Sequence, residues 1–502
     1  MARTVQSYRV LVGMEVHVQL ATKSKMFTAA PNGATNFGAE PNSLVDEVVL
    51  GLPGVLPVMN RAAVESSIMV GLALGCKIAR HTKWDRKSYY YPDLPKNYQI
   101  SQYDLPLCYE GVFHVNPGGG NAPPHAVRIR RAHLEEDAGK LLHEAPGGHP
   151  IDWSIVDLNR AGTPLLEIVT EPDLATPEQV RLFAQELQKL VQFLGVSEGQ
   201  MQMGHMRFEP NINVHITDGQ GKVHKTAITE IKNLNSFSVL ERATAYEIRR
   251  QIDQWVQTGS LGRKGTYGWD ERTETTFHQR DKEDAHDYRY FPDPDLAPVE
   301  VSDEWLGELK ARVGELPAAR RRRYVEALGL SAHDAAAMAS ERRLGDFFEQ
   351  VVGCGVEPKR AANLLEALGE TVPERMTLSQ LHASSRVDRD LSPQQVADVA
   401  RLARAGRIAA NKDTARAVLS RMMDLGGTAE QAARDLGLLQ VSDTGAIDTA
   451  IDALLAENPR SLQDVRAGKT AALGSLVGMI MKTGKGLNPK RVKERLQERL
   501  GV

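Results

Sequence analysis

Apolar and polar positions alternate with a period of two near the start of the chain. In residues 10–18 every second residue is apolar, whereas Glu15 and His17 belong to the other set. This period is typical of a β-strand with one buried face. The alternation therefore predicts that Glu15 and His17 lie on the same face of one strand.

A second strand-like run, HLEEDAGK, spans His133 to Lys140. In a regular strand His133 and Glu135 share one face and Glu136 points to the other, although a β-bulge would bring Glu136 to the same side. Clustered carboxylates raise one another's pKa and resist burial without a cation. Oxygen ligands with one imidazole favour Mg²⁺ or Mn²⁺ over structural Zn²⁺.

The same residues allow a second interpretation. Glu15 and His17 could form a solvated strand face that is paired with some of the arginines of the chain. These two segments alone do not distinguish a metal site from such a face.

The pattern changes about three-fifths of the way along the chain. Strand-like runs dominate up to about Pro298, and capping signals there predict one helix from Thr176 to Gly195 and another from Ser236 to Gly259. From about Val299 the periodicity is almost wholly helical. We therefore expect an α+β domain with a mixed or antiparallel sheet in residues 1–298, followed by two all-helical domains, 299–406 and 407–502.

The helical end of the chain is basic. Seven cations occur between Lys482 and Arg499, interrupted by two glutamates. Such a cluster can contact an RNA backbone, although a solvated helix face is the plainer interpretation. The candidate RNA-binding residues are Lys482, Lys485, Lys490, Arg491 and Lys493.

Length, charge and cysteine content limit the classes of protein to which this chain could belong. At 502 residues and 42% hydrophobic, the chain can form two to four domains with cores, and its net charge of −3 gives no overall attraction to nucleic acid. The three cysteines are far apart, which fits a reducing cytoplasm. We find no leader-like segment and no apolar run of membrane-spanning length. The glycine- and proline-rich loop from Asn116 to His125 has no Gly-Lys-Ser/Thr and is no phosphate-binding loop.

The segment Trp84 to Asp104 combines cations, tyrosines and prolines. It places Arg86, Lys87 and Lys96 among tyrosines that include Tyr91. Cations on a proline-constrained loop suit phosphate or carboxylate binding, and tyrosine can stack on a base or sugar. A surface loop held by aromatic contacts is the alternative.

Eight motifs in order resemble one known family. They are VGMEVHVQL, FGAEPN, LPGVLPVMN, WDRKSYYYPDLPKNYQISQYD, HLEEDAGK, DLNRAGTPLLEI, EIKNLNSF and DYRYFPDPDLAP. Together they resemble the B subunit (GatB) of the bacterial and organellar aspartyl/glutamyl-tRNA(Asn/Gln) amidotransferase over essentially the whole chain. The tail from Ser475 is similar to the family's C-terminal domain, which a small stand-alone helical protein family shares.

The resemblance implies a fold and an activity. It implies a cradle-shaped kinase-like domain, a helical domain and a tRNA-contacting tail, in a heterotrimer with an amidase subunit and a small third subunit. The activity would be ATP- and Mg²⁺-dependent phosphorylation of the side-chain carboxylate of misacylated Glu-tRNA(Gln), Asp-tRNA(Asn) or both, followed by amidation with ammonia from the amidase. Such an enzyme is a carbon–nitrogen ligase with glutamine as amido donor.

The resemblance also implies site residues. Glu15, His17 and Glu136 map to the catalytic, Mg²⁺-binding positions with Glu135 adjacent, and Arg86, Lys87, Tyr91 and Lys96 to ATP-phosphate binding. A cytoplasmic protein without membrane contact is expected, in possible association with a non-discriminating synthetase.

Two positions differ from many relatives. Cysteine pairs that bind zinc in those relatives are replaced here by residues 27–30 and 46–49, so no zinc is expected. Glu209 stands where relatives often have aspartate, and no metal role is assigned to it.

Two other functions compete with this one. An archaeal paralogue carries a large inserted domain, for which this chain has no spare segment. A non-catalytic tRNA-binding scaffold would have no use for the acidic residues Glu15, Glu135 and Glu136.

Overall fold

The computed structural model describes residues 3–115, 124–145, 147–281, 285–369, 391–440, 444–457, 470–483 and 487–500. The chain divides into two compact units, Met1–Leu316 and Pro317–Val502. Each is described by itself.

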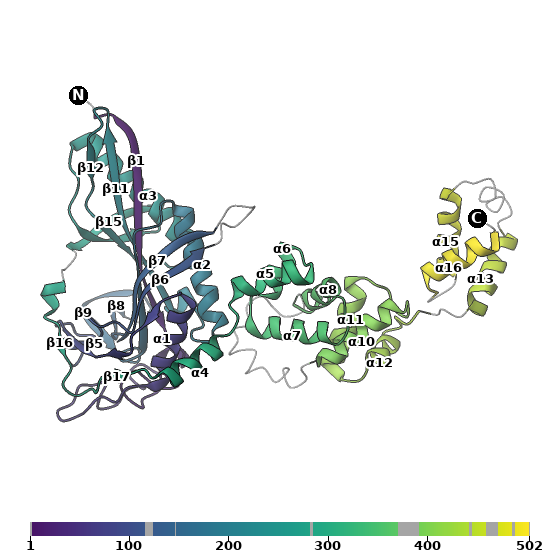
Figure 1. The fold of residues 1–502 in the computed structure, drawn as a ribbon, viewed down its shortest axis with the longest axis horizontal. Helices are drawn as coiled ribbons and strands as arrows, with labels where there is room; N and C mark the ends of the chain where they lie inside the picture. The colour runs from purple at the N-terminus through teal and green to yellow at the C-terminus, as the bar shows by residue number, and fades with distance from the viewer. Residues whose placement is uncertain are drawn as a thin grey trace. The chain divides into compact units, whose positions relative to one another are not determined.

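The first unit is built on one large sheet (Figure 1). Its strands, in spatial order, are β15 (Thr275–Asp281), β14 (Gly265–Asp270), β13 (Thr229–Lys232), β11 (Met206–Asp218), β1 (Val5–Gln19), β10 (Pro164–Thr170), β7 (His125–Glu136), β6 (Cys108–Val115) and β2 (Lys77–Ile78), with β12 (Val223–Lys225) beside β11. Only the β13–β14 pair is parallel among the described pairs of this sheet. The predicted mixed sheet is thereby confirmed.

Helices cover one face of this sheet. They are α1 (Arg61–Ala73), α2 (Pro177–Phe193) and α3 (Phe237–Thr258), and α4 (Asp303–Val313) packs on α1. The even-numbered side chains of β1 from Val10 to Val18 are buried in the main hydrophobic core. Burial of side chains of this size contributes about 1.5–3 kcal/mol each. The other face of β1 is thus left for Glu15 and His17.

The predicted starts of two of these helices are confirmed. Thr176 caps α2 by accepting a hydrogen bond from the Gln179 amide, with Pro177 in the first turn. Ser236 caps α3 in the same way, and α3 ends at Gly259, whose φ of 77° is left-handed. Glycine adopts this conformation without a Cβ clash, so it ends the helix there.

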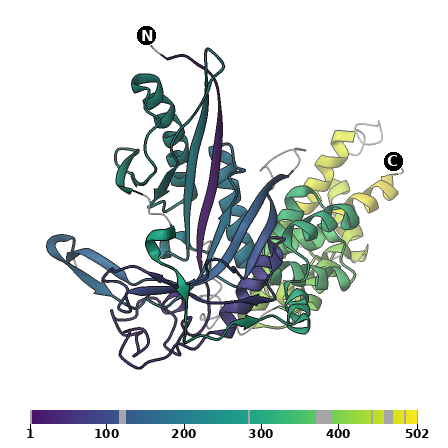
Figure 2. The same cartoon turned by 60° about the vertical axis from the view of Figure 1, so that its left-hand side comes forward.

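Three small sheets surround the large one. β4 (Asp85–Ser88) lies between β5 (Tyr98–Ser101) and β16 (Phe291–Pro292), and β3 (His81–Thr82) pairs with β17 (Val299–Glu300). β8 (Lys140–Ala145) and β9 (His149–Asp157) form a projecting ribbon (Figure 2). The pairing of β4 with β16 joins the two tyrosine-rich segments, and the Tyr103 and Tyr290 rings stack at 4.3 Å.

The described elements of the second unit are helices. One hydrophobic cluster joins α5 (Pro317–Leu328), α6 (Ala332–Met338), α7 (Arg342–Gly353), α8 (Pro358–Gly369), α10 (Pro393–Arg404), α11 (Lys412–Leu425) and α12 (Ala429–Asp435). Another joins α13 (Thr444–Glu457), α15 (Thr470–Thr483) and α16 (Pro489–Leu500). The expected helical C-terminal region is confirmed, while the boundaries at 298 and 406 stay predictions. None of the described helices has the length and apolar character needed to cross a membrane.

Candidate active site

The register of three central strands aligns charged residues across the uncovered face of the sheet. On β1, His17 lies opposite Glu167 of β10 on one side and Arg207 of β11 on the other. Glu167 in turn lies opposite His133 of β7. Because directly opposed residues project to the same face, these four side chains form one row across four strands.

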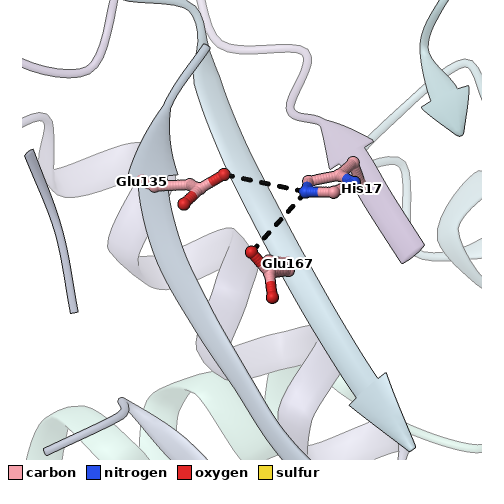
Figure 3. Close-up of side chains that lie close together, drawn as sticks. All are labelled: His17, Glu135 and Glu167. Carbon is pink, nitrogen blue, oxygen red and sulfur yellow. Dashed lines mark ion pairs between the residues drawn. The ribbon is translucent and has the colours of Figure 1, made fainter. Parts of the chain in front are cut away.

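The first acidic cluster consists of His17, Glu135 and Glu167 (Figure 3). The His17 Nε2 atom lies 3.5 Å from Glu167 Oε2 and 3.8 Å from Glu135 Oε1. His133 Nε2 lies 3.6 Å from the same Glu167 oxygen. The side chains of Glu135 and His17 are only 4% and 15% exposed, so the solvated-face interpretation does not describe this site.

Burial and mutual charge set the protonation of this cluster. Burial, and then the Glu167 carboxylate, raise the pKa of Glu135. Burial alone would also raise the pKa of Glu167, but His133, His17 and Lys87 outweigh it and hold that pKa well below its usual value. Burial lowers the pKa of His133 to about 4 despite Glu167. The buried carboxylates thus depend on neighbouring positive charge, which a bound cation could also supply.

The donor set fits a divalent cation. One oxygen or nitrogen from each of the three residues lies within 4.8 Å of the others. The buried Nδ1 atoms of His17 and His133 have no hydrogen-bond partner among the described residues. Two carboxylates and one imidazole suit Mg²⁺ or Mn²⁺.

A second acidic cluster lies beside the first. It consists of Glu15, Glu209 and Glu230, again with one oxygen of each within 4.8 Å of the others. Lys232 Nζ lies 2.6 Å from Glu209 Oε2, and Asn211 donates to Glu15 across 3.0 Å. Carboxylates without imidazole form a harder ligand set, which suits Mg²⁺.

Both clusters border one cavity of about 670 Å³. Its walls carry four cations as well as acids: Lys87, Arg131, Lys232 and Arg280. Burial is the largest influence on Lys87 and lowers its pKa, but Glu135, Glu167 and Glu15 together outweigh it and raise that pKa. The cavity thus combines acids that could hold cations with positively charged side chains, a combination that suits a polyphosphate ligand.

Comparisons with known proteins identify the family of this chain. A family model described as the GatB/GatE catalytic domain matches residues 10–307, and one described as the GatB domain matches residues 346–500. The aspartyl/glutamyl-tRNA(Asn/Gln) amidotransferase B subunit of Moorella thermoacetica is 43% identical over 495 residues, which cover 98% of this chain and 100% of the relative. The chain belongs to the GatB family of amidotransferase B subunits.

Two further relatives with the same description span this chain almost completely. The protein of Carboxydothermus hydrogenoformans is 41% identical over 498 residues, 99% of each chain. That of Synechococcus elongatus is 42% identical over 501 residues, 98% of each chain. The resemblance read from the motifs is confirmed.

The structure places the predicted phosphate-binding residues of this family member in two groups. Lys87 and Tyr91 line the cavity. Arg86 is instead paired with Asp293 and Asp295, 2.7 Å from each, and does not line it.

Glu136 and Lys96 lie together, apart from both acidic clusters. Lys96 Nζ is 2.5 Å from Glu136 Oε1, which also accepts a hydrogen bond from the Ile100 amide. Glu136 follows the alternation of β7 and faces away from Glu135, since the described register has no bulge at this pair. Its predicted metal role and the phosphate role of Lys96 remain predictions.

The predicted RNA-binding residues are partly described. Lys482 on α15 and Arg491 and Lys493 on α16 are exposed, and Arg491 lies 3.3 Å from Glu494. Lys485 lies outside the described residues, as does the side chain of Lys490.

A polar contact joins segments 27–30 and 46–49, where no zinc is expected. The Thr28 hydroxyl donates to the Asp46 carboxylate, which also accepts from the Val49 amide. Hydroxyl and carboxylate here bond to each other, and the expected absence of zinc stays a prediction.

Sequence reasoning missed several residues of the cavity. Glu167, Glu230 and Lys232 belong to quoted motifs but were given no role, and Arg131 precedes His133 by two positions. The alternation that placed Glu15 and His17 together also places Arg131 with His133. Applying the same alternation to every predicted strand would have identified these residues as facing the site. It would not have shown which residues of other strands they meet.

Proposed function

We propose that this chain is the activating subunit of a tRNA-dependent amidotransferase. It would use ATP to phosphorylate the side-chain carboxylate of Glu-tRNA(Gln), Asp-tRNA(Asn) or both. Relatives that are 41% and 43% identical carry the name of such an amidotransferase B subunit, which supports the proposal.

The chemistry requires activation because oxide cannot leave from a carboxylate. The carboxylate oxygen attacks the γ-phosphorus of ATP, and the bond to the ADP oxygen breaks. Ammonia then attacks the carbonyl carbon of the acyl phosphate, a carbon–nitrogen bond forms, and phosphate leaves with its bonding electron pair. One proton passes from nitrogen to phosphate or solvent.

The residues of the large cavity suit the first step. Lys87, Arg131, Lys232 and Arg280 would hold the phosphates and the substrate carboxylate and would spread the charge of the transferred group. The two acidic clusters would hold divalent cations. A bound cation would neutralise charge on phosphate oxygens.

The proposal depends on one observation: two acidic clusters and four cationic side chains border the same cavity. A non-catalytic tRNA scaffold gains nothing from burying carboxylates beside one another, because their repulsion costs stability. In the proposed catalytic function, those acids would instead hold divalent cations.

The proposal includes partners and a setting. An amidase subunit would release ammonia from glutamine, which makes the complex a carbon–nitrogen ligase with glutamine as amido donor, and a small third subunit would complete a heterotrimer. We place this complex in the cytoplasm, in keeping with the absence of any disulfide among the three cysteines.

The test is tRNA-dependent ATP hydrolysis by the assembled complex. The double variant Glu15→Ala, His17→Ala should lose this activity by at least about a thousandfold while glutaminase activity and assembly persist, since it removes one ligand from each cluster. The matched control is Ser7→Ala, Arg9→Ala, at exposed positions of the same strand face. Normal hydrolysis by the first variant would refute the proposed site.

A further inference from the structure

One wall of the large cavity consists of tyrosine rings from two segments that are far apart in the sequence. Tyr89 and Tyr103 follow β4 and β5, whereas Tyr288 and Tyr290 precede β16. The rings of Tyr103 and Tyr290 stack with their centroids 4.3 Å apart, and the Tyr288 ring meets those of Tyr89 and Tyr290 edge to face at 6.2 and 6.1 Å. We call these four residues the tyrosine wall.

The backbone gives the second half of this wall little support. β16 pairs with β4 through only Phe291 and Pro292, and proline has no amide hydrogen to donate. Arg289, which stands between the two tyrosines of this segment, has a φ of 47°, a left-handed conformation that is unfavourable for a residue with a side chain. Strained backbone of this kind persists only where surrounding contacts hold it. Side-chain contacts therefore keep Tyr288 and Tyr290 in place.

Arg86 of β4 supplies such contacts. Its Nε atom donates to Asp293 Oδ2 and its Nη2 atom to Asp295 Oδ2, each across 2.7 Å, and the Asp293 side chain is fully buried. The guanidinium also lies 4.3 Å from the centroid of the Tyr98 ring and 5.9 Å from that of Phe291. One side chain thus joins β4 and β5 to β16 and to the residues that follow it.

The residue after Arg86 contacts the tyrosine wall itself. Successive side chains of a strand point to opposite faces, so Lys87 projects away from Arg86. Lys87 lines the large cavity, and its Nζ atom lies 4.8 Å from the centroid of the Tyr288 ring. A displacement of β16 from β4 would therefore separate Tyr288 from Lys87 and Tyr290 from Tyr103.

The tyrosine rings differ in character from the rest of the cavity. Apart from tyrosines, every described residue that borders the cavity is polar or charged. Such groups attract water, whereas aromatic rings exclude it from a reacting group. The tyrosine wall is therefore the part of the cavity that can keep water from a bound intermediate.

The proposed reaction has an intermediate that needs this protection. Water can attack the carbonyl carbon of the acyl phosphate in place of ammonia. The bond to the phosphate oxygen then breaks, phosphate leaves with the electron pair, and the side-chain carboxylate is restored with release of a proton. One ATP is consumed and no amide is formed.

We propose that Arg86 is a positioning residue that holds the tyrosine wall in place and thereby shields the acyl phosphate from water. The inference rests on the proposed function and goes beyond it, because it concerns how tightly ATP use is coupled to amide formation. Loss of the Arg86 contacts should make ATP consumption wasteful while the phosphate-binding side chains of the cavity stay unchanged.

The experiment measures the phosphate released per amide formed by the assembled complex, with ammonium chloride as the nitrogen donor. Added ammonia makes this ratio independent of ammonia delivery from the amidase. Arg86→Gln should raise the ratio at least about fivefold while the KM for ATP changes by less than about twofold. Arg86→Lys, which keeps the charge but lacks the planar fork that binds two carboxylates, should raise it less.

The matched control is Arg80→Gln. Arg80 pairs with Asp303 beside the neighbouring β3–β17 sheet, so this variant removes a similar ion pair between the same two regions of the chain. The ratio of phosphate to amide should equal that of wild type.

The outcomes separate the inference from the proposed function. An unchanged ratio in Arg86→Gln would overturn the inference, and a higher KM for ATP at an unchanged ratio would assign Arg86 to phosphate binding instead. Should Arg86→Gln fail to assemble, Asp295→Asn removes one of the two ion pairs at a side chain that is 34% exposed, and the inference is wrong unless the ratio rises about twofold. A wild-type complex that forms no amide would contradict the proposed function itself.

Discussion

Replacing Glu167 by glutamine tests the first acidic cluster directly. The change keeps the size of the side chain and removes one negative charge. The Glu167 Oε2 atom lies 3.5 Å from His17 Nε2 and 3.6 Å from His133 Nε2, so the charge sits at the centre of the row. We expect Glu167→Gln to weaken divalent cation binding at this cluster strongly without unfolding the protein.

The distances set the size of the effect. Two unit charges about 4 Å apart interact by about 4 kcal/mol at an effective dielectric of about 20, and a divalent ion doubles this gross attraction. Desolvation cancels much of it. Even changes to residues that only support a metal ligand weaken metal binding by about 10–100-fold. Loss of the Glu167 carboxylate should therefore weaken Mn²⁺ binding at least about 100-fold.

The assay is thermal unfolding of the chain with and without Mn²⁺. At about 100 times its dissociation constant, a ligand of the folded state adds about 2.7 kcal/mol, which is a Tm rise of several degrees for a domain of this size. Wild type should show this rise, and Glu167→Gln, which keeps only the second acidic cluster, should show a smaller one. Without metal, the variant should unfold at a lower temperature near neutral pH, because His133, His17 and Lys87 hold the pKa of Glu167 below its usual value, so the Glu167 charge stabilises the folded wild type.

The control variant removes a carboxylate from a carboxylate–imidazole pair that lies outside both acidic clusters. Glu300 Oε1 lies 2.5 Å from His81 Nδ1 on the small β3–β17 sheet, so Glu300→Gln should leave the Mn²⁺ response unchanged. A wild-type Mn²⁺ response in Glu167→Gln would refute the cluster as a metal site.

Two further predictions concern a buried lysine and the basic tail. Lys25 is fully buried, and burial lowers its pKa to about 8, so its charge destabilises the folded state below about pH 8 and this penalty fades as pH rises towards 10.5. Lys25→Met should therefore raise the free energy of unfolding at pH 7 by about 1–3 kcal/mol and flatten its dependence on pH between about 8 and 10, as measured by urea unfolding. In the tail, Lys482→Gln with Lys493→Gln should lower the salt slope of tRNA binding by about 0.7–0.9 for each lost phosphate contact, measured by filter binding. Arg495→Gln, at a residue already paired with Asp448, should lower it less.

Each of these predictions has a contrary outcome. A Lys25→Met protein that is less stable than wild type at pH 7 would show that the lysine's hydrogen bond to Leu158 outweighs its burial cost. An unchanged salt slope in the double lysine variant would remove the tail from tRNA recognition.

The sequence alone determines which side chains share a strand face and where two of the helices begin. The period of two in residues 10–18 places Glu15 and His17 on one face of β1, and the caps at Thr176 and Ser236 fix where α2 and α3 begin. These features depend on neighbours within a few residues, whose geometry the backbone dictates. Long motifs in a fixed order were also sufficient to indicate the family.

Tertiary structure alone decided which residues of different strands meet. β1 lies between β10 and β11, so His17 meets Glu167, and Glu15 meets Glu209, from segments about 150 and 190 residues away. In the same way Lys96 is joined to Glu136 and Arg86 to Asp293, although both cations looked available for phosphate in the sequence. Strand period fixes the face on which a side chain lies, but strand order and register result from packing of the whole core, which no local pattern encodes.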